Sequence, residues 1–188
     1  MVRIDINKES RVCQGDILKN VEMIEYAIEK EGGIEISKII FPLVLVLTQD
    51  CDLQQDFTNR NKTNPQNHDK HLISVIVAPI YNVEHLYSGE HLSELGLKMQ
   101  EISRKSDKSD NKFLKANQNP RYHFLEFDSS IPIVESVIDF KHYFTVNIKY
   151  MDTHKENNFV CKVSELYREQ ISHRFANFLS RIGLPDDK

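Results

Sequence analysis

The chain has no tryptophan, only three cysteines and no long apolar run. A membrane-spanning helix needs about 20 consecutive apolar residues, so none is expected. Cys13, Cys51 and Cys161 are an odd number at wide spacing. That pattern is not a disulfide framework, and it favours reduced thiols. The first residues also lack the apolar stretch of a secretory signal, so we expect a cytoplasmic protein.

An excess of positive charge is missing too, because the formal net charge is −4. Proteins that bind duplex DNA depend on basic surfaces that neutralise phosphates, so this class is disfavoured. The 188 residues, 40% of them hydrophobic, are enough for one domain with a core of its own. We therefore treat residues 1–188 as a single domain.

Two apolar runs give the strongest strand signals. Leu43–Leu47 is apolar at every position, and Ile73–Ile80 is nearly so. Such runs indicate strands that are buried on both faces. Before the first run, residues 21–28 fit an extended arm, and the two glycines Gly32 and Gly33 favour a hairpin turn. We expect the two runs to lie side by side in a closed sheet.

The remaining segments are assigned by composition and period. Residues 54–70 and 103–119 are polar and predict flexible loops, whereas apolar spacing predicts a helix over residues 90–103. Further strands are expected over residues 121–127 and 131–150. A C-terminal amphipathic helix is expected over residues 164–183, which starts at Ser164 and stops before Gly183 and Pro185.

The order of these segments resembles the PemK/MazF family of small SH3-like barrels. The matching motifs are Gly15–Ile17, Pro42–Thr48, Val75–Ile80 and Glu135–Asp139. The resemblance implies a mainly β, α+β fold: an SH3-like barrel with a helical insertion and a C-terminal helix. It also implies a toxin–antitoxin or other microbial stress or defence setting, RNA as a ligand class, and pairing into a homodimer.

Two departures from the family pattern bear on catalysis. Phe41 stands where the toxins commonly have an arginine, and Tyr81 and Asn82 stand where they have threonine or serine. Those positions carry much of the cleavage chemistry in the family. The resemblance therefore implies a divergent branch without toxin-type catalysis, in which Tyr81 and Asn82 are candidate binding residues.

A second candidate site is the cluster Asp50, Cys51 and Asp52, which directly follows an apolar strand. Cys51 could act as a nucleophile if a histidine base lies nearby. The three residues could help to bind a metal with added histidines, although no metal or other cofactor is predicted. The simplest alternative is that Asp50 or Asp52 orders the following polar segment.

A third candidate combines Arg121 and His123, which are two residues apart and share a face in a regular strand. An arginine for the phosphate and a histidine as acid or base could cleave a phosphodiester without a metal, with Thr48 or Asp50 in the cleft. The alternative is a solvent-facing strand edge.

These observations lead to three candidate functions, which we give in decreasing order of preference. The first is a binding or regulatory module for a protein or RNA partner. The second is a metal-independent endoribonuclease that uses Arg121 and His123. The third is a cysteine- or metal-dependent enzyme centred on Cys51. If the chain is an enzyme, an endoribonuclease is the first expectation.

Overall fold

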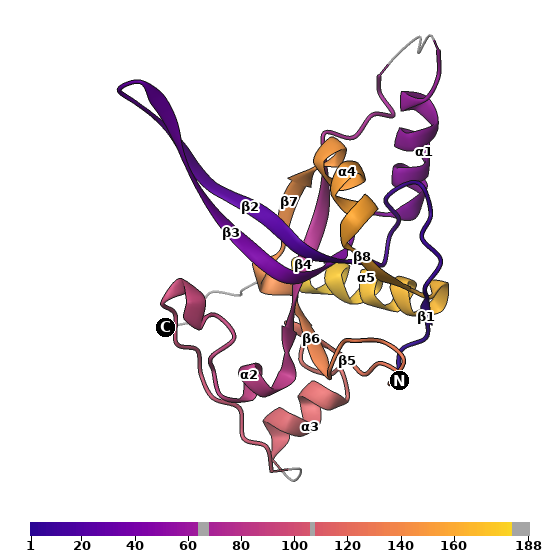
Figure 1. Cartoon of the computed structure of the whole chain (residues 1–188). Helices are drawn as coiled ribbons and strands as arrows, with labels where there is room; N and C mark the ends of the chain where they lie inside the picture. The colour runs from indigo at the N-terminus through magenta and orange to yellow at the C-terminus, as the bar shows by residue number, and fades with distance from the viewer. Residues whose placement is uncertain (64–67, 106–107, 182–188) are drawn as a thin grey trace, which may run out of the picture.

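A computed structural model describes residues 1–63, 68–105 and 108–181 (Figure 1). The described residues form a mixed α+β fold with one predominantly antiparallel sheet of eight strands, which confirms the predicted class. The strands are β1 (Ile4–Asp5), β2 (Asp16–Lys30), β3 (Gly33–Val46), β4 (Ser74–Asn82), β5 (Tyr122–Leu125), β6 (Ser136–Asp139), β7 (Phe144–Asn147) and β8 (Phe159–Val163). The helices are α1 (Asp50–Arg60), α2 (Val83–Tyr87), α3 (Ser109–Lys115), α4 (Ile148–Asn158) and α5 (Glu165–Leu179), with the short 3₁₀ turns η1 (Ser93–Leu95) and η2 (Phe140–His142).

The two apolar runs are neighbours in the sheet, as expected. β3 pairs with β4 in antiparallel register, with Val44 opposite Pro79 and Val46 opposite Val77. The strand order is β1-β8-β2-β3-β4-β6-β5, with β7 paired to β4 beside this path. No pairing joins the two ends of the order within the described residues, so the strand path is not closed. The expected closed sheet is therefore wrong for the described residues, which form an open sheet, and the resemblance to SH3-like barrels stays a prediction.

The sheet is buried on both faces at its centre. Leu18, Val44 and Val46 belong to one apolar cluster, whereas Ile17 and Leu45 belong to a second one on the other side. Leu53 of α1 and Met151 of α4 complete the first cluster. Side chains alternate across a strand, so an uninterrupted apolar run supplies both clusters at once.

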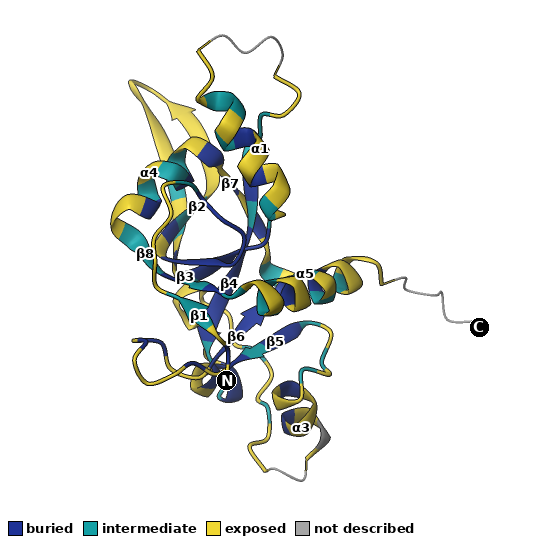
Figure 2. Ribbon diagram, turned by 90° about the vertical axis from the view of Figure 1, so that its right-hand side faces the viewer, coloured by how far each residue is buried: buried dark blue, intermediate teal, exposed yellow. Residues whose placement is uncertain are grey.

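α5 covers the second cluster, as the apolar spacing predicted. Ile171 and Phe175 are buried there, and Figure 2 shows the helix packed on the dark-blue strands. Ser164 is the residue before the helix, but its side chain makes no capping hydrogen bond. The predicted stop signals Gly183 and Pro185 lie outside the described residues.

β2 and β3 extend far beyond the rest of the sheet as a twisted hairpin arm, residues 21–40 (Figure 1). Gly32 takes a φ of +85° in the turn, which a residue with a side chain rarely adopts. The arm has a bulge between Ile24 and Tyr26. The predicted extended arm and turn are therefore confirmed.

Three segments differ from expectation. The region predicted as a loop over residues 54–70 contains most of α1, because Leu53 and Asp56 anchor a buried helix face that the polar composition concealed. The predicted loop over residues 103–119 contains α3. In contrast, residues 90–103 form only the turn η1, which ends at Gly96 with a φ of +71°.

Candidate functional site

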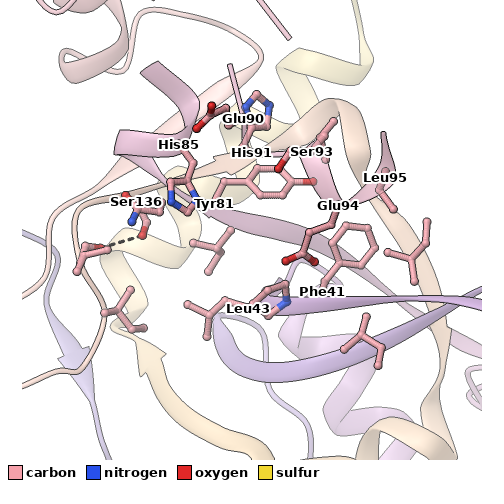
Figure 3. Close-up of a pocket in the computed structure, with 18 of the residues that line it drawn as sticks. Phe41, Leu43, Tyr81, His85, Glu90, His91, Ser93, Glu94, Leu95 and Ser136 are labelled. Carbon is pink, nitrogen blue, oxygen red and sulfur yellow. Dashed lines mark hydrogen bonds between the residues drawn. The ribbon is translucent and has the colours of Figure 1, made fainter. Parts of the chain in front are cut away.

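A cavity lies where β3 and β4 separate, at the base of the arm. It encloses about 390 Å³ (Figure 3). Most of its lining is apolar, as in typical ligand pockets. The lining residues are Ile39–Leu43, Ile80–Asn82, His85, Glu90–Leu95, Pro132–Val134 and Ser136. We call this cavity the fork pocket.

The sequence explains why the strands part at this point. The β3–β4 ladder ends with Val44 opposite Pro79, after which β4 pairs with β6 through Ile80. Pro42 and Pro79 flank the fork, and a proline has no N–H to continue a ladder. The outer side of residues 39–43 therefore faces the fork pocket instead of another strand.

Tyr81 and His91 place buried polar atoms in this apolar surrounding. The Tyr81 hydroxyl and both ring nitrogens of His91 are buried without a hydrogen-bond partner among the described residues. The two rings lie 5.0 Å apart between centroids. Buried polar atoms in folded proteins are normally paired, so these three atoms are exceptional, and a ligand reaches them only after a side-chain movement.

Burial fixes the protonation state of both side chains. Burial, and then the charge of Asp139, raise the pKa of Tyr81 above its ordinary value. Burial also lowers the pKa of His91, against an opposing effect of Asp139. Near neutral pH Tyr81 is therefore a phenol and His91 a neutral imidazole, so neither side chain adds a charge to the fork pocket.

The charges that line the fork pocket are all negative. Glu90 and Glu94 are exposed at its mouth, and Figure 3 shows the Glu94 carboxylate reaching toward Phe41. Within the described lining there is no lysine or arginine. A phosphate group would find no cation here, whereas a cationic group would be attracted.

Arg121 lies behind the fork pocket and is already paired. Its Nε and Nη2 donate to the two Asp139 oxygens at 2.9 and 2.6 Å, and His142 Nδ1 lies 2.9 Å from the same carboxylate. Burial pushes the pKa of Asp139 up, but the hydrogen bonds from Arg121 and His142 outweigh it, so that pKa is below its ordinary value. The Arg121 guanidinium is thus committed to a structural carboxylate.

His123 lies elsewhere. Its side chain is 2% exposed, packs near Phe140, and borders a separate cavity of about 160 Å³ together with Lys115 and Tyr167. Burial and the charge of Arg174 lower the pKa of His123 to about 3. The structure therefore does not bring Arg121 and His123 to one cavity, and His123 is a neutral side chain of the interior.

Thr48 and Asp50 have structural partners. The Thr48 hydroxyl accepts a hydrogen bond from the Ile76 N–H at 2.7 Å. Asp50 accepts two hydrogen bonds from Arg11 at 3.0 and 2.9 Å and one from the Gln14 N–H at 3.1 Å. These contacts tie the N-terminal segment to the start of α1.

Asp50, Cys51 and Asp52 form the first turn of α1, and three residues separate this helix from the end of β3 at Val46. Successive helix residues point in different directions, so the three side chains do not converge. Cys51 is exposed, and its sulfur makes weak contacts to Gln49 and Asp52 at 3.7 and 3.8 Å. No group of three or more metal-ligating side chains occurs among the described residues.

Of the predicted site residues, the structure brings Tyr81 and Asn82 to the fork pocket. Sequence reasoning missed His85, His91 and the two glutamates, which it had placed in or near a helix. It also treated Phe41 only as a lost catalytic position. No local spacing links Phe41 to His91, since their proximity depends on where β3 and β4 part.

The comparisons with known proteins add no relative. No family model matches the chain, and no match was found among curated proteins or solved structures. No helix of the described residues is long and apolar enough to cross a membrane.

Proposed function

We propose that the chain is a binding module that holds a segment of a protein partner, with an apolar or aromatic side chain seated in the fork pocket. The observation that carries this proposal is the pocket's lining: apolar walls, unpartnered polar atoms on Tyr81 and His91, and only negative charge at the mouth. This combination suits an apolar anchor with a cationic neighbour. We also propose that the chain is related to the PemK/MazF family and acts in a microbial stress or defence setting, as the sequence motifs imply.

A binding module is favoured over the two enzyme alternatives for chemical reasons. A histidine with a pKa near 3 inside the core is a poor acid or base near neutral pH. Arg121 would have to leave Asp139 to meet a phosphate. Within the part of the chain that the structure describes, Cys51 makes no hydrogen bond to a histidine that could activate it. RNA as the ligand is disfavoured by the acidic mouth of the fork pocket.

The test is a selection from a display library of random peptides of about 10 residues, the length of a strand-sized ligand. Peptides enriched on the wild-type chain should carry an aromatic or large apolar residue next to Lys or Arg. Leu95→Arg, which adds a cation to the pocket wall, should weaken their binding by about tenfold. Leu97→Arg is the matched control, since Leu97 is similarly exposed but does not line the fork pocket.

A labelled single-stranded RNA is tested in parallel. We expect neither saturable binding nor cleavage. The proposal is wrong if no peptide is enriched, if Leu95→Arg and Leu97→Arg behave alike, or if low protein concentrations cleave the RNA in a way that one substitution abolishes.

A further inference from the structure

The outer edge of the arm is unpaired along β3. Residues 33–43 share backbone hydrogen bonds with β2 and, among the described residues, with no other strand, because pairing with β4 begins only at Val44. In a two-stranded ribbon, alternate residues of each strand point their N–H and C=O groups outward. Such an edge is a template for another strand.

One face of the arm is apolar and exposed. Ile34, Ile36 and Ile40 alternate along β3 and therefore share a face, and Ile24 joins them because it is opposite Lys38. Their exposed fractions are 70%, 56%, 48% and 64% in that order. Lys38 and Glu22 lie on the same face and pair with each other, so the apolar surface is interrupted but remains unusually exposed for a folded domain, which indicates an interaction site.

The net negative charge of the arm indicates which kind of partner fits it. Residues 21–40 contain five glutamates and two lysines. Both lysines are already paired within the arm, Lys30 with Glu35 and Lys38 with Glu22. Glu29 and Glu31 have no cationic partner among the described residues. A second copy of the chain would bring the same negative charge, whereas a basic segment would be complementary.

The arm and the fork pocket are continuous, because the base of β3 at residues 39–43 lines the pocket. We infer that the partner binds as an added β-strand on the outer edge of β3: an extended segment with alternating apolar and Lys or Arg residues. This inference rests on the proposed function and extends it. The apolar side chains of the added strand lie beside the isoleucines on the same face of the arm, and the end of the strand delivers the anchor side chain into the fork pocket.

The test uses the peptides enriched on the full chain. They should show apolar residues at every second position with Lys or Arg between them. Ile34→Lys should weaken their binding by about tenfold, because it removes apolar contact and adds like charge. Leu166→Lys, at a similarly exposed residue of α5 far from the arm in sequence, should leave the affinity unchanged. Amide hydrogen exchange of residues 33–43 should slow when the peptide is bound.

The outcomes separate the two proposals. Peptides whose binding depends on Leu95 but not on Ile34 would overturn the added strand and keep the pocket. Enriched peptides with helical apolar spacing or with acidic residues would also overturn it. A dimer of the chain alone that Ile34→Lys dissolves would show that a second copy occupies the arm, and the inference would be wrong.

Discussion

The two halves of the β2–β3 hairpin are built from similar residues but lie in opposite environments. In the inner half, Ile17, Leu18, Val44 and Leu45 are at most 1% exposed. In the outer half, the isoleucines at positions 24, 34 and 36 are more than half exposed. Helices and neighbouring strands cover the inner half only, as the burial colours of Figure 2 show.

An apolar pattern in the sequence therefore predicts a strand, but it does not predict whether other elements of the fold will bury that strand. The inner residues stabilise the fold by leaving water. The outer isoleucines remain in water and contribute little to folding, so binding is the natural reason for their presence. Substitutions inside and outside the arm test whether the two regions differ in their contribution to stability.

The largest difference in stability should separate a buried ion pair outside the arm from an exposed ion pair within it. Asp139→Ala removes a fully buried carboxylate and leaves the partly buried Arg121 without its partner, so we expect a loss of roughly 3–5 kcal/mol in the free energy of unfolding. Lys38→Ala breaks the exposed pair with Glu22 and should cost at most about 1 kcal/mol. Urea unfolding of both variants measures the difference, and equal losses would contradict it.

Truncation of apolar side chains gives the next largest effect. Leu45→Ala opens a cavity beneath α5 and should destabilise the fold by about 2–5 kcal/mol. Ile34→Ala removes surface that is already in water and should change stability by no more than about 0.5 kcal/mol. Thermal or urea unfolding decides between them. A large loss for Ile34→Ala would mean that the arm packs against something in the free chain.

His123 should make the free energy of unfolding decrease at acid pH. Its pKa falls from 6.5 when exposed to about 3 when folded, so the unfolded chain binds the proton more readily. Stability from this group is fully present above pH 6.5 and decreases as the pH falls toward 3, by about 1.4 kcal/mol per pH unit at most. His123→Leu should flatten the dependence of unfolding free energy on pH between these limits, and an unchanged slope would refute the assignment.

The smallest effect should come from Cys51. It is the exposed thiol, whereas burial raises the pKa of both Cys13 and Cys161 to about 12. A thiol reagent should label Cys51 at an ordinary rate in the native chain and the other two only after unfolding. Cys51→Ser should leave peptide binding unchanged. Labelling much faster than that of a free cysteine would instead support the hypothesis of a cysteine-dependent enzyme centred on Cys51.

Sequence reasoning reached the central strands, the hairpin and α5, because Leu43–Leu47, Gly32 and Ile171 carry local signals of period or turn, but it did not predict β1, β8 or α4. It missed α1, whose buried face depends on Leu53 and on Asp56, a polar residue held by Arg60 and the Leu72 N–H. It found Tyr81 and Asn82 but not their neighbours. The fork pocket arises from the end of one strand pair, a long-range feature that no single segment encodes.

The outer edge of β3 and the fork pocket together form the proposed partner-binding surface. Hydrogen–deuterium exchange of the full chain, with and without a saturating enriched peptide, tests it most directly. Protection should appear over residues 33–43 and at the segments around Tyr81 and His91. Protection confined to residues 48–52 or 121–125, with none along β3 or the fork pocket, would contradict the account.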